Sequence, residues 1–170
     1  MKKNRSKKGQ IFSIDLVVAV IVFIFILIAS FWAWHITENR INYIRTIRDM
    51  TIIAQNSVNT IVSTHGHPTD WFSLPDDELI NIQSFGIIYN KKGVASTDKI
   101  ARLQYLSALD YNKTKEKLGI IGPGMEFYLM AGDYNIGSPM ENARDVVIVN
   151  RAMALENGTF IPIKMRVWRK

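Results

Sequence analysis

Residues 7–34 read KKGQIFSIDLVVAVIVFIFILIASFWAW, and this stretch decides how the chain is organised. Its last nineteen residues, Leu16–Trp34, carry no charge and a single hydroxyl group, that of Ser30. About 20 apolar residues in an α-helix, rising about 1.5 Å each, span the hydrocarbon core of a bilayer. Two tryptophans close the run, and tryptophan is enriched where membrane meets water. The sequence therefore predicts a membrane-spanning helix over residues 10–35.

Positive charge is concentrated before the apolar run. The first eight residues hold five basic side chains and no acid: Lys2, Lys3, Arg5, Lys7 and Lys8. Because lysine-rich and arginine-rich flanks stay on the cytoplasmic side, we expect residues 35–170 to lie outside the cell. The whole chain has a net charge of +6, but residues 10–170 hold 16 basic and 15 acidic side chains. This near balance argues against a nucleic-acid partner, which needs a basic face on the folded domain.

The helix is predicted to continue beyond the membrane. No proline or glycine occurs between Gln10 and Thr64. We expect residues 36–64 to form an amphipathic continuation that packs against a globular head. A membrane anchor joined to a separate first helix, with a break near Thr37, is the alternative. The predicted stripe has apolar residues mostly three or four apart, namely Ile36, Tyr43, Ile44, Ile47, Met50, Ala54, Val58 and Ile61.

Residues 65–170 are predicted to form a small head without disulfides, since the chain contains no cysteine. The fold class is then α+β: a long N-terminal helix packed against short helices and an antiparallel sheet that ends in a β-hairpin. Asn157-Gly158 separates two β-rich runs and predicts that hairpin, closed by a type I′ turn. Pro162 suggests a sheet edge, or a site where no ladder donor is needed. Further expected elements are strands over residues 84–89 and 126–130, a helix capped by Ser96 or Thr97 with the buried stripe Ile100, Leu103, Leu106 and Leu109, and a helix over residues 110–118.

The junction before the apolar run resembles a known processing signal. The sequence KKGQ of residues 7–10, with Asp15 entering the apolar helix, resembles the class III signal peptide of archaeal type IV pilin-like proteins. In that family a prepilin peptidase cuts before the apolar helix, so the resemblance implies cleavage between Gly9 and Gln10 and a leader of residues 1–9. Family members commonly carry an acid at the fifth mature position, whereas Asp15 is the sixth if Gln10 is the first. Either the acid is shifted by one residue, or the cut lies one residue later.

Asp15 is a candidate assembly residue on physical grounds. A carboxylate at the head of a membrane helix is costly unless it is paired. In a pilin-like assembly it meets the new α-amino group of a neighbouring subunit, because the amine of its own Gln10 lies about 7–8 Å away along the helix axis. The alternative is that Asp15 lies among lipid headgroups and favours the helix N-terminus. The partners implied are the membrane, the prepilin peptidase and other pilin-like subunits that contact the N-terminal helix.

The head offers few other candidate sites. Asn112 and Asn157 begin Asn-x-Thr sequons, where N-glycosylation is physically possible outside the cell. His65, His67 and Asp70 share a short turn and invite a metal interpretation, but further ligands are lacking nearby, so we expect no metal and no cofactor. The sequence contains no nucleophile elbow, phosphate loop or metalloprotease motif. No catalytic residue is therefore predicted, and we do not expect an enzyme.

Three classes of function remain. The first is a structural or assembly subunit of an archaeal type IV pilus-like filament or complex at the cell surface. The second is an uncleaved, single-pass membrane-anchored surface module that binds a partner through its head. The third, an enzyme or transporter accessory, requires a deep pocket with converging polar groups. The fate of the leader separates the first two, because its removal exposes the amine that Asp15 would pair with.

Overall fold

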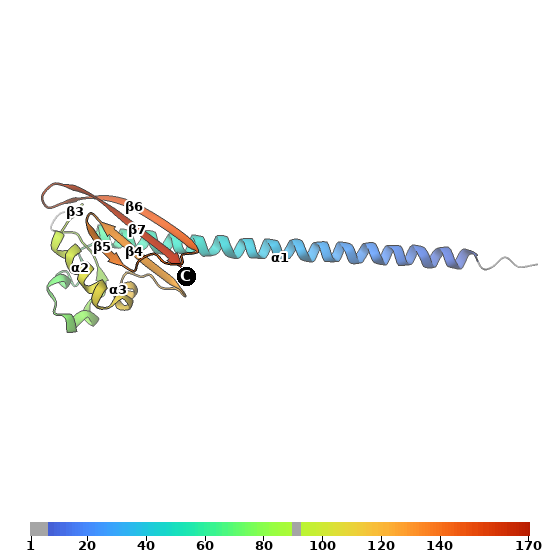
Figure 1. The fold of residues 1–170 in the computed structure, drawn as a ribbon, viewed down its shortest axis with the longest axis horizontal. Helices are drawn as coiled ribbons and strands as arrows, with labels where there is room; N and C mark the ends of the chain where they lie inside the picture. Colours follow the sequence, from blue (N-terminus) through green and yellow to red (C-terminus); the bar gives the residue numbers. More distant parts are fainter. Residues whose placement is uncertain (1–6, 90–92) are drawn as a thin grey trace, which may run out of the picture. The chain divides into compact units, whose positions relative to one another are not determined.

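The computed structural model describes residues 7–89 and 93–170, and its fold is α+β, as predicted (Figure 1). Helix α1 runs over Lys7–Ser63 and is followed by a head of short helices and two sheets. The chain divides into two compact units, one up to Arg45 and one from Thr46 to Lys170. The division falls inside α1, so this helix contributes residues to both units.

The second part of α1 belongs to the head. The predicted apolar stripe is confirmed there, because Met50, Ala54, Val58 and Ile61 are fully buried. The stripe is wrong nearer the N-terminus, where its members are exposed. The exposed fractions of Ile36, Tyr43 and Ile44 are 49%, 57% and 55%. Helical spacing thus identifies a face that can be buried, and the head buries it only from Met50 onward.

The C-terminal end of α1 is held by the segment that follows strand β2 (Ser84–Phe85). The Ile87 N–H donates to the Ile61 carbonyl at 2.9 Å, and the Ile88 N–H donates to the Thr64 carbonyl at 3.1 Å. The last carbonyls of a helix have no donor within the helix, so this segment satisfies that of Ile61 in α1 and also that of Thr64, the residue after it. The strand predicted over residues 84–89 is only two residues long in the structure, because the Ile87 and Ile88 N–H groups bond to Ile61 and Thr64. Ile88 also forms an isolated antiparallel bridge with Ala95.

The main sheet has five strands in the order β3-β6-β7-β4-β5. β3 pairs with β6 in parallel, and the other neighbours are antiparallel. Side chains of β4 alternate between buried and partly exposed, as they do when one face of a sheet is covered. The smaller sheet pairs β1 with β2. The remaining strands are β1 (Gly66–His67), β3 (Val94–Ala95), β4 (Met125–Ala131), β5 (Tyr134–Gly137), β6 (Asp145–Leu155) and β7 (Phe160–Arg169).

The predicted hairpin is confirmed as β6 and β7, but its turn is not of type I′. A type I′ turn needs positive φ at both central residues. Gly158 has a φ of 81°, whereas Asn142 is the sole non-glycine residue with positive φ in the described part of the chain. Asn157 instead accepts a hydrogen bond from the Thr159 N–H on its side-chain oxygen at 2.9 Å. The loop is therefore a longer connection in which glycine alone supplies the left-handed conformation.

Pro162 does not mark a sheet edge, because β7 lies between β6 and β4. Its second predicted explanation is the correct one. The last pair between β4 and β7 joins Ala131 to Ile163, so Pro162 lies one residue beyond the β4 ladder. Its carbonyl still accepts a hydrogen bond from the Gly132 N–H at 3.1 Å, but no ladder donor is required of it.

The two predicted helices of the head are α2 (Thr97–Leu109) and α3 (Tyr111–Lys117). Ile100, Leu103 and Leu106 are buried in α2 as predicted, but Leu109 is 51% exposed. It occupies the last turn, where the chain turns into α3. The side chain of Asp110 caps α3 by accepting a hydrogen bond from the Lys113 N–H. Two 3-10 helices, η1 (Trp71–Ser73) and η2 (Asp76–Asn81), precede α2.

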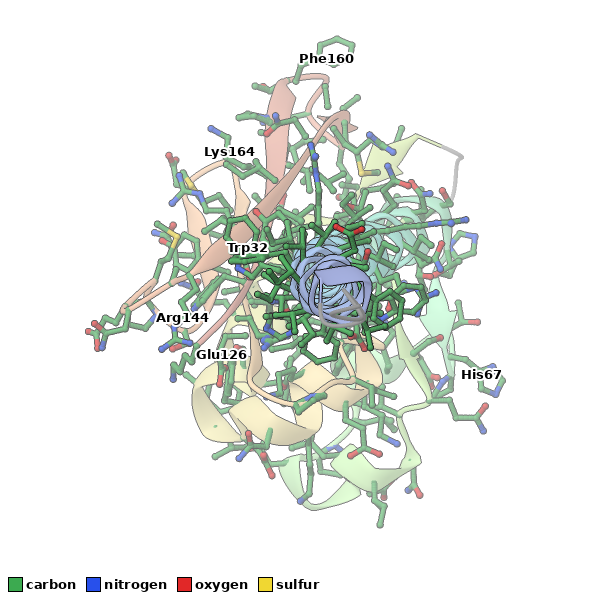
Figure 2. The ribbon with its side chains drawn as sticks, turned by 90° about the vertical axis from the view of Figure 1, so that its right-hand side faces the viewer. Trp32, His67, Glu126, Arg144, Phe160 and Lys164 are labelled. Carbon is green, nitrogen blue, oxygen red and sulfur yellow. The ribbon has the colours of Figure 1, made fainter. Side chains whose placement is uncertain are left out.

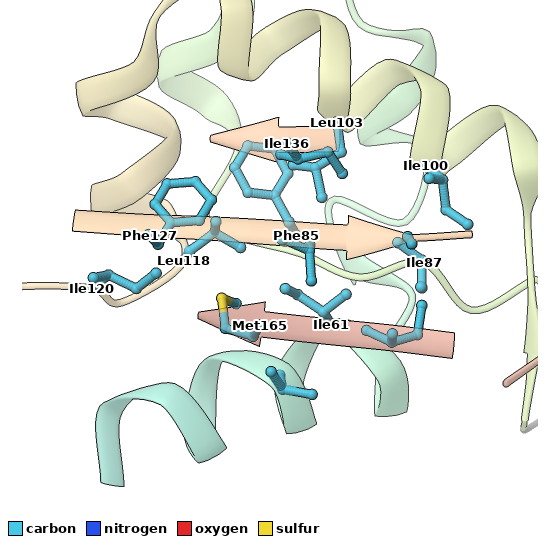
Figure 3. Close-up of a cluster of buried hydrophobic side chains, with 14 of the residues drawn as sticks. Ile61, Phe85, Ile87, Ile100, Leu103, Leu118, Ile120, Phe127, Ile136 and Met165 are labelled. Atoms are coloured by element: carbon cyan, nitrogen blue, oxygen red, sulfur yellow. The ribbon is translucent and has the colours of Figure 1, made fainter. Parts of the chain in front are cut away.

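The core of the head joins α1, the main sheet and α2 (Figure 3). Ile61 of α1, Met165 of β7 and Phe127 of β4 are fully buried within one apolar cluster. Ile136 and Leu103 extend this cluster toward β5 and α2. The second part of α1 is therefore a structural element of the head rather than a connection leading to it.

Candidate functional site

The exposed apolar surface of α1 is the principal candidate for a functional surface. Every described residue from Ile14 to Arg45 is exposed. An 18-residue window within this helix has a mean hydropathy of 3.0, and none of it is buried. Among the described residues, α1 is the one helix that is long and apolar enough to cross a membrane. A contiguous apolar surface of this size is unfavourable in water, which makes it a candidate for contact with lipid or with other helices.

Aromatic side chains gather where the apolar run ends. Phe31, Trp32 and Trp34 are 77%, 69% and 72% exposed. Trp32 projects outward from the helix (Figure 2). Just beyond, the Thr37 hydroxyl donates to the Ala33 carbonyl at 2.8 Å, which satisfies this polar group within the helix. The change from apolar to aromatic to polar side chains matches the sequence of environments from a bilayer core to water.

Asp15 is exposed at the start of the apolar run. Neither a hydrogen bond nor an ion pair joins it to any residue that the structure describes. It is also the one charged residue between Ile14 and Glu38. A partner for this carboxylate, if it enters an apolar environment, has to come from outside the described chain.

The predicted processing junction lies at the very start of α1. Lys2, Lys3 and Arg5 of the leader lie outside the described residues. Lys7, Lys8, Gly9 and Gln10 fall within the helix, but their side chains are not among those described. The Gly9–Gln10 peptide bond therefore lies in the first turn of a helix, and a peptidase that cuts it has to open that turn.

The two sequons differ in accessibility. Asn157 and Thr159 are both exposed in the loop between β6 and β7. Asn112 is exposed in α3, but the hydroxyl-bearing residue of its sequon, Thr114, is 0% exposed. In the folded head, therefore, the Asn157 sequon presents both of its recognition side chains to solvent, and the Asn112 sequon does not.

The histidine turn does not assemble a set of metal ligands. His65 Nδ1 lies 3.1 Å from the Ile88 carbonyl oxygen, whereas His67 points away from the head at its surface (Figure 2). In residues 7–89 and 93–170, no group of three or more histidine, cysteine, aspartate or glutamate side chains is placed to hold a metal ion.

Two polar arrangements in the head were not predicted from the sequence. Tyr111 donates a hydrogen bond to Glu126, and the Tyr111 hydroxyl accepts one from the Phe127 N–H at 3.1 Å. Burial and the bond to Glu126 raise the pKa of Tyr111 well above its usual range. The second arrangement is a buried ammonium group, that of Lys99, next to a surface hollow. Both depend on residues far apart in the chain, and neither has a sequence motif.

Comparison with protein-family models, with curated proteins and with solved structures finds no match to this chain. The functional interpretation therefore depends on the residues and the geometry described above.

Proposed function

We propose that the chain is a structural or assembly subunit of an archaeal type IV pilus-like filament or complex at the cell surface. One observation carries this proposal: the residues from Ile14 to Arg45 are all exposed, while Met50 and the stripe that follows it are fully buried. An apolar helix of this length needs lipid or neighbouring helices around it. A subunit that is stored in the membrane and then joins other subunits uses both.

The junction around Gly9 supports a processed subunit. A prepilin peptidase would remove residues 1–9, whose five positive charges keep that end in the cytoplasm. The apolar helix would remain on the mature chain, and the head would lie outside. In this proposal the peptidase does the chemistry, and the chain supplies the substrate and the building block.

Asp15 would set the position of one subunit against the next. Its carboxylate has no partner among the described residues, and the mature N-terminus of a neighbour would supply a positive charge. An ion pair in a low-dielectric environment is stronger than one in water, and an unpaired charge there is costly. Subunits would therefore join in the register that pairs the two groups.

Processing is tested by the variant Gly9→Leu, because a peptidase that fits the chain closely at the cut tolerates only a small residue before it. We expect the precursor to remain uncleaved in the membrane of the native host, as measured by the intact mass of the purified chain. The matched control is Ser6→Leu, which adds the same side chain three residues before Gly9 and should be processed normally. Normal processing of Gly9→Leu would exclude this site.

Assembly is tested separately by Asp15→Ala. We expect normal cleavage and membrane insertion but a lower yield of filaments or complexes sheared or extracted from the cell surface. The control is Asp49→Ala, which removes an exposed carboxylate from the part of α1 that belongs to the head. An unchanged yield with Asp15→Ala would remove Asp15 from the mechanism, and a retained leader in the unmodified chain would favour the anchored surface module instead.

A further inference from the structure

Lys99 is a buried cation without an anionic partner in the described structure. It lies in the first turn of α2 and is 4% exposed. Its Nζ donates hydrogen bonds to the His65 carbonyl at 2.7 Å and to the Ile88 carbonyl at 3.1 Å. An ammonium group has three N–H donors, so the protein uses two of them. Lysine is rarely buried to this extent unless an opposite charge neutralises it.

The two carbonyl bonds have a structural purpose, because they attach α2 to the turn that follows α1. They do not neutralise the charge. No carboxylate of the described residues lies within ion-pair distance of Lys99, and burial lowers the pKa of this lysine. The ring of Phe72 has its centroid 5.5 Å from Nζ, a distance at which a ring face attracts a cation only weakly compared with a carboxylate.

Lys99 also lines a surface hollow of about 230 Å³. Lys99, Ser96 and Ile88 line its buried part, with exposed fractions of 4%, 4% and 2%. Phe72 and Tyr89 line its exposed part and are 37% and 46% exposed. A buried lysine and a buried serine together with two partly exposed aromatic side chains are the features of a site for a small polar ligand with an apolar portion.

The opening also carries polar groups. His65, Thr69 and Asp70 line the hollow. Because a carbonyl oxygen only accepts hydrogen bonds, His65 Nδ1 must donate to the Ile88 carbonyl, which leaves Nε2 free of that bond. The hydroxyl of Thr69 and the carboxylate of Asp70 are able to accept hydrogen bonds from hydroxyl or amino groups of a ligand.

We propose that this hollow binds a small organic carboxylate, which accepts the third N–H of Lys99 and places its apolar portion against Phe72 and Tyr89. The ligand supplies the negative charge that the buried ammonium lacks. This binding site lies entirely in the head, and it goes beyond the proposed role in assembly. It holds whether or not the leader is removed.

The test is isothermal titration calorimetry of the full chain in detergent micelles. The probes are sodium glucuronate and sodium benzoate, each compared with a neutral molecule of similar body, glucose and benzyl alcohol. We expect at least one carboxylate to bind and its neutral counterpart to bind about tenfold or more weakly, as the loss of a charge-assisted hydrogen bond predicts. Tighter binding of glucuronate would show that the polar side chains of the hollow bind hydroxyl groups of the ligand. Tighter binding of benzoate would show that its aromatic side chains bind a ring of the ligand.

Two variants attribute the binding to this hollow. Lys99→Met should abolish it, and Tyr89→Ala should weaken it without removing a buried group, which keeps the test valid if the lysine variant fails to fold. The control is Lys113→Met, which removes an exposed lysine of α3 and should bind normally. The proposal is overturned if neither carboxylate binds, if the neutral molecules bind equally well, or if Tyr89→Ala and a folded Lys99→Met both bind as the unmodified chain does.

Discussion

Helix α1 contains two apolar segments that differ in burial. Between Thr46 and Ser63, apolar residues three or four positions apart are fully buried by the head. Between Ile14 and Arg45 the helix is more apolar, yet every described residue is exposed. The first segment, Ile14–Arg45, therefore presents an apolar surface that no described residue of the chain covers. Within it, the apolar residues of Leu16–Trp34 do not form a narrow stripe, as they do in an amphipathic helix, but extend all round the helix.

The largest expected effect comes from making the same substitution, isoleucine to alanine, in each of the two segments. Ile61→Ala removes a fully buried side chain from the core and should cost the head about 2–5 kcal/mol of its free energy of unfolding. Ile24→Ala, in the exposed segment, should leave the stability of the head unchanged. Both are measured by denaturant unfolding of the full chain in detergent, followed by tryptophan fluorescence. Equal effects would show that the two segments are not independent.

A smaller effect concerns the closure of the head on the end of α1. A Cβ at Gly86 would overlap the Thr64 carbonyl oxygen and the Gly66 nitrogen, both of which are backbone atoms. Gly86→Ala should therefore destabilise the head by about 1–3 kcal/mol, as other overpacked sites do. The matched control is Gly122→Ala, whose Cβ would meet the flexible side chain of Met125. The same unfolding measurement applies, and a cost no greater than the control's would contradict the described closure.

A single hydrogen bond fastens α1 to the segment after α3. The buried Ser57 hydroxyl lies 2.7 Å from the Leu118 carbonyl oxygen and 2.9 Å from the Ile53 carbonyl oxygen of its own helix, and its one hydrogen is assigned to the shorter bond, to Leu118. Ser57→Ala should cost about 1 kcal/mol, the usual net value of such a bond. Thr51→Ala is the control, because the Thr51 hydroxyl bonds only to the Ile47 carbonyl of its own helix. If the two variants unfold at the same denaturant concentration, the bond to Leu118 contributes nothing measurable.

The smallest effect is a pH dependence confined to the head. Asp76 accepts a hydrogen bond from the Tyr105 hydroxyl at 2.7 Å and forms an ion pair with Arg102 at 2.8 Å. The Tyr105 bond, followed by Arg102, lowers the pKa of Asp76 from its usual 3.8. A lowered pKa in the folded state means that the stabilisation is fully present above 3.8 and is lost as the pH falls through the folded value.

Asp76→Asn should therefore lower stability slightly at neutral pH and make no difference at a pH below the folded pKa. Thermal unfolding at both pH values measures this. Asp133→Asn, at an exposed aspartate with no hydrogen-bond or ion-pair partner among the described residues, is the control. A stability difference for Asp76→Asn that persists unchanged at low pH would contradict the assigned cause.

The sequence predicts well what depends on neighbours along the chain. Uninterrupted helical spacing identified α1, and Asn157-Gly158 identified the hairpin. The turn type was wrong because the loop is longer than two residues, so one left-handed glycine is enough. The position of Pro162 was not decidable from the sequence, since it depends on where β4 ends. Leu109 was predicted to be buried because it continues the spacing of Ile100, Leu103 and Leu106, but the head leaves the last turn of α2 uncovered there.

The part that could not be predicted depends on contacts between distant residues. Strand β5 has only four residues, too few for a periodic pattern to be recognised. Lysine is usually exposed, and the burial of Lys99 accompanies hydrogen bonds to two carbonyls 34 and 11 residues away in the chain. A sequence pattern carries no record of such contacts. The candidate assembly helix was visible in the sequence, and the candidate ligand site was not.

The central claim is that residues 16–34 remain on a mature subunit, where lipid or neighbouring subunits cover them. The most direct measurement is the intact mass and N-terminal sequence of the protein recovered from its native membrane or cell surface. The account predicts a chain that begins at Gln10, or at Ile11 if the cut lies one residue later, and that still contains Leu16 to Trp34. A chain that begins at Met1, or one that has lost the apolar helix, would contradict it.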